Sequence, residues 1–332
     1  MLPVSAVIAA SVVILLPLVA RAGPTADSLP GIYPAPLPAS IAEVPMRPGP
    51  PQNGHGTAAR YARDHPGTAP PGANDFSCRS KDHSRPVVLL HGTDANAYSD
   101  WAAISPRLRS AGYCPFAVNY GGRPGEDSFG TEDITRSAYQ VADFVARVRA
   151  ETGAPRVDLI GYSQGATVAR LYVNRLGGAA SVARWIGLAS PTYGGVLYGA
   201  VPIAQAIPGA LDVATQLVSV AAVQQVQGSP LLDDLNAGGD TVAGVEYTTI
   251  GSRYDEVIQP ADNAALRSPG ATNIVLQDSC PVDLTGHFHL VYDPYVIDLL
   301  LTTLDAARPR TAPCVPVPLG TGIAELIEAT YN

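Results

Sequence analysis

Residues 156–165 have the sequence Arg-Val-Asp-Leu-Ile-Gly-Tyr-Ser-Gln-Gly, which is the most informative stretch of this chain. Their apolar beginning is typical of a short strand buried on both faces, and a helical pattern follows from Ala166 to Leu176. Between the two, Ser163 stands in a Gly-x-Ser-x-Gly pattern. A serine in this context sits on a strained turn, where side chains larger than glycine would collide with the neighbouring strand and helix. The stretch therefore predicts a strand, a tight turn and a helix, with the Ser163 hydroxyl raised above a sheet.

Further apolar runs on both sides of this turn predict additional strands. Between them, apolar residues recur at helical spacing from Thr131 to Thr152, with acidic residues near the amino end and arginines near the other, as the helix dipole favours. Strands that alternate with helices are typical of a mostly parallel sheet covered on both faces. The sequence therefore predicts an α/β fold. The additional strands are expected at Pro86–His91, Phe116–Tyr120, Arg184–Ala189, Val245–Ile250 and Asn273–Gln277.

A serine hydroxyl becomes a nucleophile only beside a base, which an acid must orient. When the serine stands on this kind of turn, the chain order is Ser, then Asp or Glu, then His. Four of the six histidines precede Ser163, so the order leaves His287 and His289. Two residues apart in an extended stretch, their rings would face opposite ways, so only one could reach Ser163. The residues alone do not choose between them.

The acid is expected on a loop just after a later strand. Asp255 follows the predicted strand that ends at Ile250, and it is our first choice for the orienting carboxylate. Glu256 is a close alternative, and Asp283 is a weaker one.

A negative oxygen that develops on a substrate needs backbone donors. The loop after the first core strand opens with His91-Gly92-Thr93, where Gly92 permits close approach of the backbone. Thr93 can offer its amide and its hydroxyl, and Gln164, directly after the serine, can offer a second amide at a helix amino end. We therefore expect an oxyanion hole formed by Thr93 and Gln164.

The amino-terminal end differs in composition from the rest. An apolar run from Val4 to Val19 is followed by Ala-Arg-Ala at 20–22, which is typical of a secretory signal peptide cleaved after Ala22, although no Lys or Arg precedes Arg21. Residues 23–75 are rich in Pro, Gly and Ala, and they predict an extended or partly disordered arm. Residues 76–332 would form the globular domain. We expect a protein that is secreted or associated with the cell envelope.

Charge and motifs exclude several classes of partner. The formal net charge is −8 and Lys81 is the only lysine, whereas nucleic-acid binders carry a basic face. His287 and His289 lack carboxylates at metal-ligand spacing, and no phosphate loop or dinucleotide fingerprint follows the first strand. We therefore expect no nucleic acid, no metal and no cofactor.

Residues 196–235 are unusually apolar and include a predicted helix from Leu211 to Val226. One interpretation is ordinary core. The other is a wall or mobile cover of a pocket for an acyl chain, because burial contributes about 0.8 kcal/mol per methylene.

Four motifs in this order along the chain resemble the class 2 secreted lipases, which include actinobacterial triacylglycerol lipases and the yeast lipase B type. The resemblance runs from about Phe76 to Cys314 and implies the α/β-hydrolase fold. It also implies that Ser163 is the nucleophile, Asp255 the acid and His287 the base, and it assigns no role to His289. The motifs are His-Gly-Thr at 91–93, Gly-Tyr-Ser-Gln-Gly at 161–165, Tyr-Asp-Glu-Val-Ile-Gln-Pro at 254–260 and Cys-Pro-Val-Asp-Leu-Thr-Gly-His at 280–287.

The resemblance implies further features. The oxyanion donors would be the amides of Thr93 and Gln164, assisted by the Thr93 hydroxyl. Disulfides would join Cys78 to Cys114 and Cys280 to Cys314, which suits an exported protein.

These observations together predict a secreted triacylglycerol lipase that forms an acyl-enzyme, acts on an acyl ester or lipid substrate, contacts a lipid interface and is a monomer. A carboxylesterase, thioesterase or acyltransferase on the same residues is the first alternative. A non-catalytic envelope protein that only binds lipid is an alternative of another class.

Overall fold

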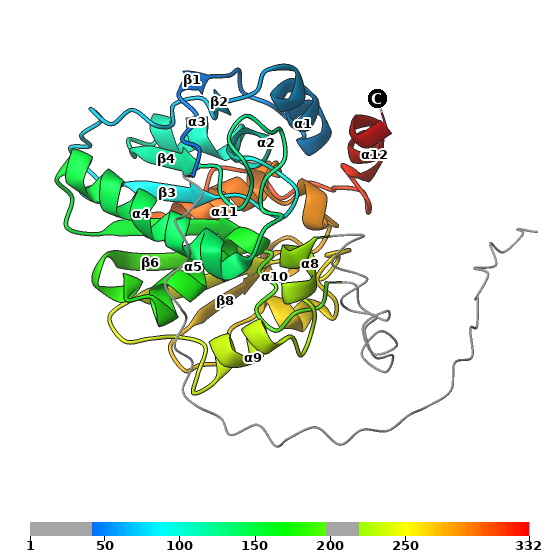
Figure 1. The fold of residues 1–332 in the computed structure, drawn as a ribbon. Coiled ribbons are helices and arrows are strands. Elements are labelled where there is room, and N and C mark those ends of the chain that lie inside the picture. The colour runs from blue at the N-terminus through cyan, green and yellow to red at the C-terminus, as the bar shows by residue number, and fades with distance from the viewer. Residues whose placement is uncertain (1–41, 197–218, 332) are drawn as a thin grey trace, which may run out of the picture. The chain divides into compact units, whose positions relative to one another are not determined.

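The six predicted strands form one parallel sheet in the computed structural model, which describes residues 42–196 and 219–331 (Figure 1). Its strand order is β4-β3-β5-β6-β7-β8, so the strand that leads into Ser163 lies in the interior of the sheet. The predicted mostly parallel α/β sheet is confirmed. The strands are β3 (Val87–Leu90), β4 (Pro115–Val118), β5 (Val157–Tyr162), β6 (Val182–Leu188), β7 (Glu246–Gly251) and β8 (Thr272–Val275).

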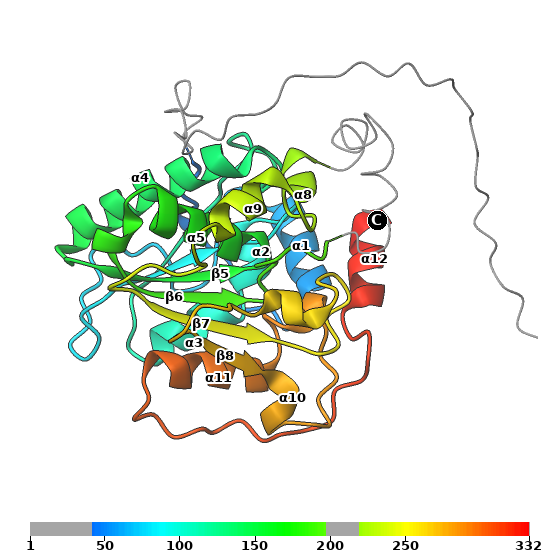
Figure 2. The same cartoon turned by 90° about the horizontal axis from the view of Figure 1, so that it is seen from below.

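Helices cover both faces of this sheet. Figure 2 shows α4 (Ile134–Thr152) and α5 (Gln164–Arg175) on one side, and α3 (Ile104–Ser110) and α11 (Pro294–Leu304) on the other. All residues of β3, β4 and β5 are buried as a result, which explains their continuous apolar runs.

The helix predicted from Thr131 begins at Ile134, because the Asp133 side chain accepts a hydrogen bond from the Arg136 amide and caps it. The helix ends at Thr152, and Gly153 caps it with a φ of 73°, which a residue with a side chain rarely adopts.

Shorter helices connect these layers. Most of them lie at the carboxyl ends of the strands or in the last third of the chain. They are α2 (Ala97–Trp101), α8 (Val220–Gln224), α9 (Pro230–Asn236), α10 (Leu276–Ser279), α12 (Ile323–Tyr331) and the 3-10 turns η1 (Gly178–Ala180), η2 (Ala261–Ala264) and η3 (His287–His289).

The segment from residue 42 to 75 differs from the extended arm that its composition predicted. It contains the two-residue strands β1 (Arg47–Pro48) and β2 (Thr68–Ala69) and the helix α1 (His55–Asp64), which packs against α2 and α12. The buried face of α1 consists of small and polar residues, so the sequence shows no apolar periodicity that would predict this helix. Residues 1–41, including the predicted signal peptide, lie outside the described residues, as do 197–218.

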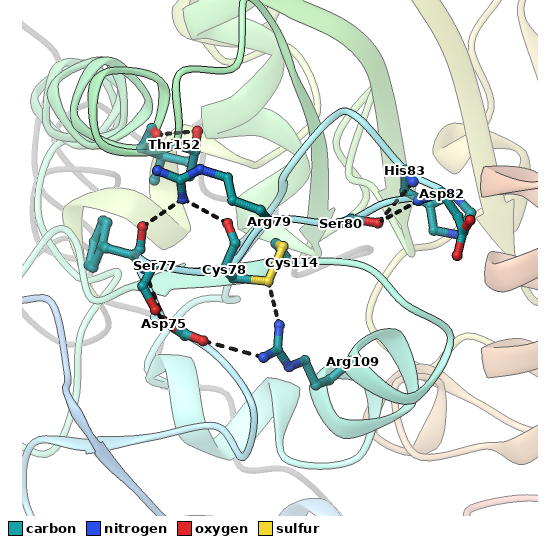
Figure 3. The surroundings of a disulfide bond; sticks show 12 residues. Asp75, Ser77, Cys78, Arg79, Ser80, Asp82, His83, Arg109, Cys114 and Thr152 are labelled. Carbon is teal, nitrogen blue, oxygen red and sulfur yellow. Dashed lines mark hydrogen bonds and ion pairs between the residues drawn. A yellow bond between two sulfur atoms is a disulfide. The ribbon is translucent and has the colours of Figure 1, made fainter.

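Both disulfides that the resemblance implied are present. Cys78 pairs with Cys114 and Cys280 pairs with Cys314, with Cα–Cα distances of 5.8 and 5.4 Å. Figure 3 shows the first of them, with the Arg109 guanidinium in contact with the Cys78 sulfur. Because Cys114 directly precedes β4, this bond ties the segment before β3 to the sheet.

Candidate active site

Ser163 lies on the sharp turn between β5 and α5. Its φ is 51° and its ψ is −120°, a conformation that few residues with a side chain adopt. The glycines on either side permit the turn. A Cβ on Gly161 would lie 2.3 Å from the Ala166 amide nitrogen, and one on Gly165 would lie 2.1 Å from the Leu90 carbonyl oxygen.

Three side chains from distant parts of the chain meet at this turn. The distance from His287 Nε2 to Ser163 Oγ is 3.1 Å, and the distance from His287 Nδ1 to Asp255 Oδ2 is 2.9 Å. All three residues are buried. Since Nδ1 faces a carboxylate, it carries the ring proton, and Nε2 is left as an acceptor for the serine hydroxyl.

The acid and the histidine are themselves held in place. Asp255 Oδ1 accepts hydrogen bonds from the amides of Val257 and Ile258, at 2.9 and 2.7 Å. The Tyr162 hydroxyl donates to the His287 carbonyl oxygen at 2.9 Å. Burial, and secondarily the charge of Asp100, raises the pKa of Tyr162 well above its ordinary value, so the hydroxyl keeps the proton that it donates.

The alternative acids, Glu256 and Asp283, do not hydrogen-bond to the His287 ring. Glu256 accepts a hydrogen bond from the His287 backbone amide at 2.6 Å, and Asp283 accepts one from the Thr285 amide at 3.0 Å. The distance from His289 Nε2 to Asp293 Oδ2 is 4.0 Å. His287 and His289 belong to a 3-10 turn and not to the extended stretch assumed from sequence. At about 120° per residue, the two rings still point in different directions.

The Thr93 hydroxyl is held by two glutamine side chains. Its oxygen accepts hydrogen bonds from Gln164 Nε2 at 2.9 Å and Gln225 Nε2 at 3.0 Å. A hydroxyl oxygen has two lone pairs and one hydrogen. Because both lone pairs are occupied, the hydrogen is free to be donated to a third group. Among the described residues, the amides of Thr93 and Gln164 have no hydrogen-bond partner either.

A cavity of about 200 Å³ opens beside Ser163 and His287. Much of its wall is apolar and comes from Val196, Ala222, Val257 and Phe288. Val196 and Ala222 belong to the apolar segment 196–235. The described parts of this segment therefore form part of the cavity wall. Half of the helix predicted at 211–226, residues 211–218, lies outside the described residues. In the described half, α8 spans Val220–Gln224.

Sequence reasoning missed three side chains here. Gln225 carries no local signal, since it stands at the end of a short helix with no motif around it. His55 and Asp100 also line the cavity. The chain order excluded His55 as the catalytic base because it precedes Ser163. That order says nothing about other roles of a histidine.

A family model described as Lipase (class 2) matches residues 84–299, which is more than half of the chain. A triacylglycerol lipase of Pseudarthrobacter phenanthrenivorans is 36% identical over 90 residues, or 26% of this chain and 27% of that protein. A triacylglycerol lipase of Burkholderia plantarii is 36% identical over 90 residues, or 26% of this chain and 24% of that protein. The matches therefore span about a quarter of either relative.

Among solved structures, Aspergillus fumigatus lipase B superposes with a TM-score of 0.57 at 19% identity, covering 79% of this chain and 63% of that one. This likeness agrees with the α/β-hydrolase architecture of the sheet and its flanking helices. The family match includes Thr93, Ser163 and His287, which line one cavity. It also includes Asp255, which is hydrogen-bonded to His287. The chain belongs to the class 2 lipase family.

Proposed function

We propose that this protein is a carboxylic ester hydrolase, and specifically a triacylglycerol lipase, in which Ser163, His287 and Asp255 form the catalytic triad. The observation that carries the proposal is the continuous hydrogen-bond chain from Ser163 Oγ through the His287 ring to Asp255. Its position beside a largely apolar cavity suits an acyl chain. Family membership and the match to triacylglycerol lipases support the choice of reaction.

In the first half of the reaction, Ser163 Oγ attacks the ester carbonyl carbon while its proton passes to His287 Nε2. Asp255 keeps the ring in the required tautomer and stabilises the imidazolium. The negative oxygen of the tetrahedral intermediate accepts hydrogen bonds from the amides of Thr93 and Gln164 and from the Thr93 hydroxyl. The bond to the alcohol oxygen then breaks, and the alcohol leaves with the proton from His287.

In the second half, a water molecule gives its proton to His287 and attacks the acyl-enzyme. The bond between the acyl carbon and Ser163 Oγ breaks, the proton returns to the serine, and the fatty acid is released.

We also propose that the protein is exported. Two disulfides are typical of secreted proteins, and the segment up to Ala22 has the pattern of a signal peptide. The mature chain would begin near Gly23, and its folded domain would begin by residue 42, earlier than the boundary at residue 76 expected from composition.

The test has two parts. A fluorophosphonate probe should label the parent protein and fail to label Ser163→Ala; a parent that is not labelled would support a lipid-binding protein without catalysis. On p-nitrophenyl esters from acetate to palmitate, kcat/KM should rise about fourfold for each methylene that enters the cavity, as about 0.8 kcal/mol per methylene implies. Hydrolysis of emulsified trioleoylglycerol separates a lipase from a carboxylesterase, and thioesters and alcohol acceptors probe the other acyl-transfer reactions.

A further inference from the structure

A second histidine–carboxylate pair lies behind the loop that carries Thr93. The distance from His55 Nε2 to Asp100 Oδ1 is 2.8 Å, and the other carboxylate oxygen, Oδ2, accepts a hydrogen bond from the Gly92 amide at 2.7 Å. Asp100 is fully buried and His55 is 9% exposed. His55 Nδ1 has no partner among the described residues, so Asp100 is the only hydrogen-bonding contact of the ring there.

The two peptide units on either side of Gly92 are held by side chains. In the first, the Gly92 amide donates to Asp100 and the His91 carbonyl oxygen accepts from the Tyr120 hydroxyl. In the second, the Gly92 carbonyl oxygen accepts from His91 Nδ1 at 2.8 Å. The only group of these two units without a partner in the described part of the chain is the Thr93 amide.

The geometry of a trans peptide makes this arrangement directional. Its N–H and C=O point in opposite directions, so the bond from His91 to the Gly92 carbonyl also sets the direction of the Thr93 N–H. Burial lowers the pKa of His91, which keeps this ring neutral and able to accept the Tyr120 amide on Nε2. The hydrogen bond from the Gly92 amide to Asp100 fixes the peptide unit between His91 and Gly92, where the loop to Thr93 begins.

Gly92 lies between Ser163 and Asp100. A Cβ at Gly92 would be 3.4 Å from Ser163 Cβ and 3.5 Å from Asp100 Oδ2. A small shift of the Asp100 carboxylate would therefore move the loop relative to the nucleophile. His55 comes from α1, which precedes the residues that the family model matches.

We propose that His55 and Asp100 are positioning residues of the oxyanion hole. His55 holds the Asp100 carboxylate, Asp100 holds the Gly92 amide, and the Thr93 amide is thereby presented to the negative oxygen. This inference rests on the proposed ester hydrolysis. It assigns to the segment before the family match a direct part in the geometry of the site.

The test compares His55→Ala, His55→Gln and Asp100→Ala with the parent on matched soluble ester and thionoester substrates. Sulfur accepts hydrogen bonds poorly, so the parent should prefer the ester by a large ratio that reports the quality of the oxyanion hole. In His55→Ala and Asp100→Ala, kcat for the ester should fall between about 10-fold and about 100-fold with KM little changed, and the preference should shrink. His55→Gln keeps an N–H donor near the position of Nε2 and should recover most of the loss. His65→Ala, a change at the other end of α1, is the matched control and should keep the rate and the preference of the parent.

Rates are expressed per fluorophosphonate-reactive site, so that unfolded protein does not enter them. The positioning role would be overturned if kcat fell equally on the ester and the thionoester in His55→Ala and Asp100→Ala. It would also be overturned if both variants kept the kcat of the parent. Both results would leave the proposed triad intact. A parent without labelling at Ser163 would instead overturn the proposed function, and this inference with it.

Discussion

Replacement of Gly165 by alanine would place a methyl group between the two backbones that build the site. The new Cβ would lie 2.1 Å from the Leu90 carbonyl oxygen, whereas ordinary van der Waals contact begins at 3.4 Å, so a movement of 1.3 Å is required. The atoms it meets are backbone atoms of Leu90 and His91, which cannot rotate away. The sheet and α5 must therefore separate.

Two consequences follow. Overpacking of this kind costs about 1–3 kcal/mol of the free energy of unfolding. Because Leu90 leads through His91 to Thr93, the same movement takes the loop that carries Thr93 away from Ser163. A misplacement of about 1 Å costs about 100-fold in rate, and we expect a loss of that size in kcat/KM on a soluble ester.

The fluorescence of Trp101 and Trp185, both fully buried, reports unfolding in urea, and p-nitrophenyl butyrate reports activity. Gly251→Ala is the matched control, since its Cβ would meet only Ala264 Cβ at 3.6 Å, and we expect it to keep the activity and stability of the parent. If Gly165→Ala unfolds at the same urea concentration as the parent and keeps its kcat/KM, the predicted clash does not occur.

Three further predictions test other parts of the structure. Thr93→Val removes the free hydroxyl hydrogen and should lower kcat by about 10-fold to 100-fold, while Thr93→Ser should stay within a few-fold of the parent; equal losses in steady-state assays would contradict the role of the hydroxyl. The double change Cys280→Ala/Cys314→Ala opens a loop with a sequence separation of 34 and should lower the free energy of unfolding by about 3.8 kcal/mol, measured with urea; a change below about 1 kcal/mol would show that the bond does not constrain the unfolded chain. Burial raises the pKa of Tyr113 to about 12, above its ordinary value of 10.0, so folding retains a proton that the unfolded chain releases and stability falls as pH rises through this window. Tyr113→Phe also removes a buried hydroxyl without a partner among the described residues, so it should be neutral or stabilising at pH 7 and lose less stability from pH 10 upward; an unchanged slope in urea titrations would count against this account.

The turn that carries Ser163 could be predicted because its determinants are local. The apolar run of β5, the two glycines and the start of α5 lie within a few residues of one another, and each has one dominant physical reason. The same holds for the other strands, whose burial on both faces produces continuous apolar runs.

The partners of Ser163 were harder to predict because they depend on where distant loops meet. Chain order restricted the base to two histidines, and only the 3-10 turn at 287–289 brings the ring of His287, and not that of His289, to Ser163. The contacts of Gln225 and His55 could not be predicted from the sequence. Each contributes one hydrogen bond across more than 40 residues of sequence, and nothing in the neighbouring residues reflects it.

The contact between α1 and α12 has a practical consequence for anyone who shortens this chain. A Cβ on Gly56 would lie 2.5 Å from the Glu325 carbonyl oxygen, and Arg63 donates to the Ala329 carbonyl oxygen at 2.7 Å, so the two outer helices are packed as one unit. Trimming to the family boundaries would delete this unit together with Cys78 and Cys314, leaving Cys114 and Cys280 as unpaired thiols. Expression vectors for biochemical work should therefore retain both flanks.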